Sequence, residues 1–104
     1  MTIKTDQLAN CRKKIDLIDI KILELLSKRF SLCKKLVLLK QRLDLTILDK
    51  KREETCLKLR KKEAKKFEIS EKFSLSLFKV IFRESRLIQK EINASTSFDK
   101  NTKK

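Results

Sequence analysis

The sequence predicts an all-α fold of three helices per subunit, of which the first is very long. The 104 residues contain no Gly and no Pro. Tight turns and sheet corners are therefore hard to build, whereas long helices carry no penalty. Apolar residues recur with the helical period, and no segment shows the two-residue alternation typical of a strand.

The first predicted helix begins near Thr5 or Asp6, either of which can cap it, and keeps its period to about Leu43. One seam of this helix holds seven aliphatic residues and one arginine: Ile15, Ile18, Ile22, Leu25, Arg29, Leu32, Leu36 and Leu39. A helix of about 38 residues is roughly 57 Å long, about twice the width of a compact chain of this size. Because water disfavours an exposed aliphatic seam, we expect the same helix of a second copy to cover it.

Two further helices follow a break in the period at residues 44–48. Asp49 can cap the second helix, which runs to about Lys66, and Ser70 begins the third, which runs to about Ile92. The predicted inner side of the second helix consists of Cys56, Leu57 or Leu59, Ala64 and Phe67. The predicted apolar face of the third consists of Phe73, Leu77, Phe78, Ile81, Phe82, Leu87, Ile88 and Ile92. Residues 1–93 thus form one predicted domain, and residues 94–104 form a basic tail that we expect to be disordered.

The amino-acid composition indicates which cellular compartment and which kinds of binding partner to expect. The net charge of +14 suits an anionic partner, and a hydrophobic content of 40% is enough for a core. The three cysteines lie far apart and there is no His, so we expect buried free thiols in a reducing cytoplasm and no metal site. Neither a signal peptide nor a membrane-spanning run is present in the sequence, and no membrane partner is expected.

Cations occupy apolar positions of the first predicted helix. Arg29 lies on the aliphatic seam, where an unpaired charge is strongly disfavoured by desolvation. Lys40 is eleven residues on and therefore lies about 20° from Arg29 around the helix axis. Arg12 belongs to a neighbouring row that also contains Lys40. Arg29 could instead pair with Asp19 or Glu53, and Lys40 could extend its amine to water.

The second and third helices carry complementary polar groups. Asp49, Arg52 and Glu53 share one face at spacings of three and four residues. Ser85 and Gln89 share an otherwise apolar face. Together with the cations they could surround a small cavity. Each also has a structural interpretation: Asp49 as a cap, Arg52 and Glu53 as a solvated face, and Ser85 and Gln89 bonded to each other or to backbone.

These residues resemble the active-site pattern of the all-helical chorismate mutases. The pattern lies in CRKKIDLID (11–19), LLSKRF (25–30), Lys40, DKKRE (49–53) and SRLIQ (85–89), with the family's order and spacing and no gap. The resemblance covers about residues 8–92, and it is strongest to the mutase domain of bacterial bifunctional chorismate mutase–prephenate dehydratases. The chain departs from it at residues 45–48, where relatives commonly have a proline, and at 36–39, where Gly or Ala is common.

The resemblance implies an isomerase that rearranges chorismate to prephenate, a step of the shikimate pathway in aromatic amino acid and phenylalanine biosynthesis. It implies an intertwined homodimer with two active sites. The rearrangement is pericyclic and requires no cofactor, metal or nucleophile, which suits a chain without His or Tyr. Such an enzyme holds a reactive conformer and stabilises the charge that develops in the transition state.

By the same resemblance, four residues act on the carboxylates and the ether oxygen of the substrate. Arg29 binds a carboxylate within its own subunit, and Arg12 reaches in from the other subunit. Lys40 and Gln89 donate hydrogen bonds to the ether oxygen, and Lys40 also touches a carboxylate.

The resemblance assigns the remaining polar residues to the substrate ring and the site wall. Glu53 and the backbone around Asp49 hold the ring hydroxyl, and Ser85 and Arg52 complete the polar wall. The implied catalytic residues are Arg29, Lys40, Glu53 and Gln89.

Two other functions remain open at this point. A lyase that removes pyruvate from isochorismate can use a similar site on the same fold. A non-enzymatic basic helical module could bind nucleic acid or another polyanion through its charge, although the six Phe lie mostly on apolar faces and offer no stacking platform. We therefore expect no specific nucleic-acid partner. Added salt should abolish polyanion binding more strongly than catalysis in a shielded site.

Overall fold

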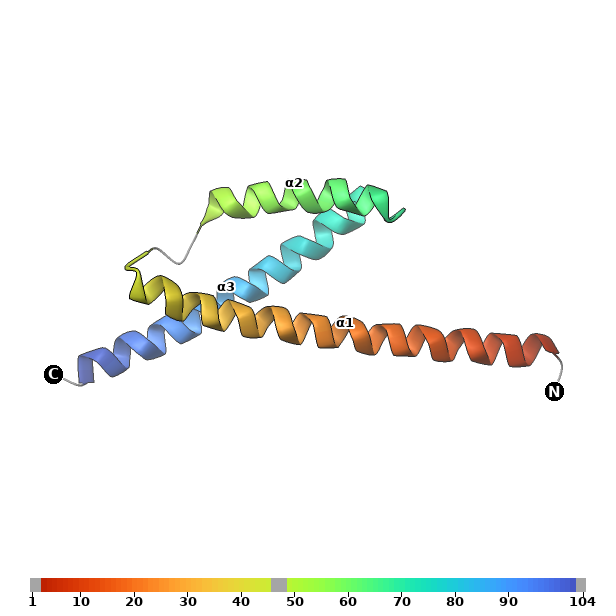
Figure 1. Cartoon of the computed structure of the whole chain (residues 1–104), viewed down its shortest axis with the longest axis horizontal. Coiled ribbons are helices and arrows are strands. Elements are labelled where there is room, and N and C mark those ends of the chain that lie inside the picture. Colours follow the sequence, from red (N-terminus) through yellow and green to blue (C-terminus); the bar gives the residue numbers. More distant parts are fainter. Residues whose placement is uncertain (1–2, 46–48, 103–104) are drawn as a thin grey trace. The chain divides into compact units, whose positions relative to one another are not determined.

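The computed structural model describes residues 3–45 and 49–102, with side chains described at 4–45 and 49–95. Over these ranges the chain forms α1 (Ile3–Arg42), α2 (Lys50–Lys66) and α3 (Glu71–Thr102) (Figure 1). The described residues contain no strand, and α1 is 40 residues long. The predicted all-α class with a very long first helix is therefore confirmed. The chain divides into two units, residues 1–32 and 33–104.

Residues 1–32 contribute the larger part of α1. The described side chains from Lys4 to Leu25 are all exposed, and the aliphatic seam is open to solvent in the single chain. Cys11 is exposed as well, so its predicted burial was wrong. The physical reason is that this unit is a single helix, which has no interior of its own.

Residues 33–104 contain a hydrophobic core to which all three helices contribute. Val37 of α1 is completely buried, and Phe82 of α3 is nearly so. The other buried apolar residues of this unit are Cys33, Cys56, Ala64 and Ile81. The predicted burial of two of the three cysteines is thereby confirmed.

Helices α2 and α3 form an antiparallel hairpin, drawn from green to blue in Figure 1. Near the start of α2, Glu53 pairs with Arg86 at the middle of α3 at 2.5 Å. Near the end of α2, the Lys61 amine lies 3.9 Å from the Glu71 carboxylate at the start of α3. These two pairs come from opposite halves of α2, as the antiparallel register of the hairpin requires.

Helices α1 and α2 are each followed by a residue with left-handed backbone conformation. Asp44 has φ of 55° and Glu68 has φ of 58°. After α2, the Ile69 N–H donates to the Ala64 carbonyl at 2.9 Å, the long bond of a Schellman motif. Gly usually occupies this position, but the chain contains none, so two acidic residues adopt a conformation that their Cβ atoms disfavour.

The start of each hairpin helix agrees with the sequence prediction. Asp49 caps α2, and the Ser70 hydroxyl accepts from the backbone N–H of Phe73 at 3.2 Å.

The predicted inner side of α2 is confirmed at one of its two alternatives and wrong at its last residue. Leu57 rather than Leu59 belongs to the inner side of α2. Phe67 is 74% exposed because it is the C-cap, where the backbone leaves the helix and the helical stripe ends.

The predicted apolar face of α3 is only partly covered in the single chain. Ile81 and Phe82 are buried, whereas Phe73, Leu77 and Leu87 are exposed. Backbone helix continues past Asn93 to Thr102, and the predicted division into a domain and a tail stays a prediction.

Parts of two predictions lie outside the described residues. They are residues 46–48 of the predicted break and residues 103–104 of the predicted tail. Residues 46–48 include most of the segment 45–48, where the chain differs from the family pattern. Within the described helices, none combines the length and apolar content needed to cross a bilayer.

Candidate active site

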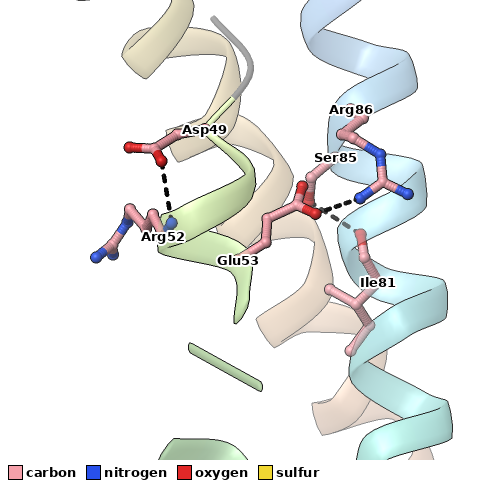
Figure 2. A network of polar contacts seen from close by, with 6 residues as sticks. All are labelled: Asp49, Arg52, Glu53, Ile81, Ser85 and Arg86. Atoms are coloured by element: carbon pink, nitrogen blue, oxygen red, sulfur yellow. Dashed lines mark hydrogen bonds and ion pairs between the residues drawn. The ribbon is translucent and has the colours of Figure 1, made fainter. Parts of the chain in front are cut away.

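The first turn of α2 presents three of the predicted site residues. The Asp49 carboxylate accepts a hydrogen bond from the backbone N–H of Arg52 at 3.0 Å, which fixes the start of the helix (Figure 2). The capping role considered for Asp49 is therefore confirmed. Arg52 has an exposed side chain, whereas Glu53 is half-buried and turned toward α3.

Glu53 forms an ion pair that the sequence did not indicate. Its Oε2 accepts a hydrogen bond from a guanidinium nitrogen of Arg86 at 2.5 Å, and the two residues are 33 positions apart in the chain (Figure 2). The Arg86 and Glu53 side chains are 34% and 29% exposed. Glu53 therefore belongs to the α2–α3 interface rather than to a solvated helix face. The one feature of the sequence that could have suggested a role for Arg86 was its position directly after Ser85, a predicted site residue.

Ser85 is a buried polar residue on the inner face of α3. Its hydroxyl donates to the carbonyl of Ile81 at 3.0 Å, one helical turn earlier (Figure 2). This bond is the backbone contact that the structural interpretation of Ser85 anticipated.

Lys40 and Gln89 lie on two helical segments that are joined by a hydrogen bond between neighbouring residues. The Gln41 side-chain amide donates to the side-chain oxygen Oδ1 of Asn93 at 2.8 Å, which joins the last turn of α1 to α3. Lys40 precedes Gln41, and Gln89 lies one turn before Asn93. Both predicted residues are half-buried. The Lys40 carbonyl also accepts from the N–H of Leu45 at 2.8 Å, which secures the backbone of this turn.

The two remaining predicted residues belong to residues 1–32. Arg12 is exposed, and Arg29 is half-buried rather than buried as its seam position predicted. The difference has the same cause as the exposure of Cys11, because a lone helix offers no interior. The meeting of these two arginines with the other site residues stays a prediction.

Residues 33–104 thus supply an amine, a carboxylate, a hydroxyl and an amide from three helical segments. These groups come from Lys40, Glu53, Ser85 and Gln89. Amines and amides can stabilise developing negative charge, and a carboxylate can accept from a substrate hydroxyl. These types of group are suited to binding a polar anion.

Comparison with known proteins identifies the family of the chain. The model of the family described as chorismate mutase type II matches residues 11–90. The chain belongs to the type II chorismate mutase family. The matched range contains all eight predicted site residues, from Arg12 to Gln89. A curated chorismate mutase from Methanocaldococcus jannaschii is 34% identical over 98 residues, covering 94% of this chain and 98% of that protein.

Membership of the chorismate mutase family confirms three predictions made from the sequence. These are the family itself, the all-helical fold and the isomerase class. No solved structure matches the chain significantly.

Proposed function

We propose that the chain rearranges chorismate to prephenate in a site built from the eight predicted residues. The observation that carries this proposal is the family match over residues 11–90, which includes all eight. The structure adds that four of them are half-buried or buried in one unit: Lys40, Glu53, Ser85 and Gln89.

The carboxylates of the substrate would be held by arginines. Arg29 would bind one carboxylate within its own subunit, and Arg12 would reach a carboxylate from the partner. A guanidinium and a carboxylate can form two parallel hydrogen bonds, which fix orientation as well as position. Holding a flexible dianion in its reactive conformation removes an entropic part of the barrier.

The ether oxygen would be stabilised from the end of α1 and from α3. Lys40 and Gln89 would donate to it as the C–O bond breaks and negative charge grows there. The Gln41–Asn93 hydrogen bond supports this pairing, because it holds the turns that carry the two donors together. Donors fixed before the reaction stabilise the transition state without having to reorganise.

The ring hydroxyl would lie at the α2–α3 interface. Glu53 would accept its proton in a hydrogen bond, with the backbone at Asp49 nearby, and Ser85 and Arg52 would complete the polar wall. Because the Ser85 hydroxyl already donates to Ile81, we expect Ser85 to act toward substrate as an acceptor.

The active form would be an intertwined homodimer that acts in the cytoplasm in aromatic amino acid biosynthesis. All seven aliphatic residues of the α1 seam are more than 40% exposed in the single chain. A continuous apolar stripe of this kind is costly in water and is best covered by a second copy of α1. All three cysteines are free, which suits a reducing compartment.

Incubation of the purified protein with chorismate tests the proposal, with the product identified by NMR. Prephenate should form, and Arg29→Ala should abolish turnover while leaving the helical dimer intact. Release of pyruvate from isochorismate, with no action on chorismate, would establish the lyase instead. If neither substrate reacts and RNA binds with strong salt dependence, the polyanion-binding module would replace the enzyme.

A further inference from the structure

The α2–α3 interface contains a pocket of about 270 Å³ that is lined by more positive than negative side chains. Its charged lining consists of three cations of α3, Lys79, Arg83 and Arg86, and one carboxylate of α2, Glu53. The cations are spaced by four and three residues, so they lie along one face of α3. Apolar side chains of both helices complete the lining.

Arg86 differs from the other two cations in its contacts and burial. It forms the 2.5 Å ion pair with Glu53 and is half-buried, whereas Lys79 and Arg83 are exposed. Glu53 is itself half-buried. The pair is therefore a defined interhelical contact, not one of the many solvated charges of this basic chain.

The position of Arg86 on α3 connects the pocket with the proposed active site. Arg86 follows Ser85 directly and lies three residues before Gln89. Figure 2 shows the Arg86 guanidinium directed at the carboxylate of Glu53. A change at Arg86 would thus act on Glu53 first, without removing any group assigned to substrate.

We propose that Arg86 is a positioning residue that holds Glu53 in its substrate-binding conformation. The proposal rests on the proposed function, in which Glu53 accepts from the ring hydroxyl. Arg86 binds the Oε2 atom of Glu53, and a carboxylate has a second oxygen that can accept from the substrate. Without Arg86, the glutamate side chain would sample several rotamers, and substrate would have to order it.

Steady-state kinetics of Arg86→Met and Arg86→Lys test this role. Methionine retains much of the length and apolar stem but removes the charge. We expect Arg86→Met to lower kcat/KM by about tenfold, because small misplacement of a substrate-contacting group is costly. Arg86→Lys should recover part of the loss, since it restores a cation near Glu53. Arg83→Met is the matched control from the same pocket and should retain wild-type kinetics.

A second set of variants separates positioning from a general effect on folding. When Glu53→Gln is already present, Arg86→Met should cause almost no further loss of kcat/KM, because the ion pair is already gone. Circular dichroism and sedimentation should show the same helical dimer for every variant compared.

These experiments distinguish a failure of the Arg86 positioning role from a failure of the proposed mutase function. An inactive wild-type protein would overturn the mutase function and the role of Arg86 with it. An active wild type with an equally active Arg86→Met variant would overturn the role of Arg86 alone. Equal losses from Arg86→Met in the wild type and in the Glu53→Gln variant would also overturn it, since they would show an effect independent of the Glu53 carboxylate.

Discussion

The side-chain amide of Gln41 donates to Asn93 at 2.8 Å and thereby joins the last turn of α1 to α3. This bond lies beside two residues proposed to act on the same substrate atom, Lys40 and Gln89. Both partners are half-buried, so the bond is shielded in part from competing water. This hydrogen bond therefore joins the two helical segments that carry the proposed donors Lys40 and Gln89.

Replacing Asn93 by Ala should weaken both folding and catalysis. A buried or half-buried hydrogen bond contributes about 1 kcal/mol, and we expect the free energy of unfolding in urea to fall by about that amount. The value of kcat/KM should fall several-fold, because the turn carrying Lys40 would be less firmly held. Asn93→Asp keeps the acceptor oxygen and should retain most of both properties. Unchanged stability of Asn93→Ala would show that the bond has no structural role.

Mixed dimers should reveal whether Arg12 acts across the subunit boundary. Arg12→Ala and Arg29→Ala should each be inactive alone. If the two variants are unfolded together and refolded at equal concentration, half the dimers are mixed, and each mixed dimer has one intact site. The mixture should therefore recover about one quarter of wild-type activity. No recovery on mixing, with dimers present, would mean that both arginines act within one subunit.

A lysine on the α1 seam should dissociate the dimer. Ile22 lies on the seam, so Ile22→Lys would place a charge in the proposed interface, where it would be desolvated without a partner. Sedimentation should show a shift toward monomer and a loss of activity. Ser27→Lys is the control, because Ser27 lies about 140° from Ile22 and about 160° from Leu25 around the helix axis, on the side opposite the seam. Equal effects of the two substitutions would argue against this seam as the interface.

Glycine at the end of α2 should stabilise the protein. Glu68 has φ of 58°, a conformation that Gly adopts without steric penalty. Glu68→Gly should raise the free energy of unfolding by about 0.5–1 kcal/mol, as measured in urea. Glu68→Ala removes the same charge but keeps a Cβ, and it should not reproduce the gain. A gain of equal size from Ala would assign the effect to charge rather than to backbone conformation.

The helical period and the lack of Gly and Pro determined the fold class and the long first helix. These are local properties, since each turn of a helix is set by nearby residues. The caps at Asp49 and Ser70 were predictable for the same reason. The spacing of eight polar residues also sufficed to indicate the family, which the comparisons confirmed.

Only the tertiary structure decided which polar groups meet between helices. The pairing of Glu53 with Arg86 depends on the register of two antiparallel helices, and no local pattern specifies that register. The same holds for Gln41 and Asn93, which are 52 residues apart. Burial is likewise a property of neighbours: Val37 is completely buried, whereas equally apolar seam residues of the first 32 positions remain exposed because their own unit is a single helix.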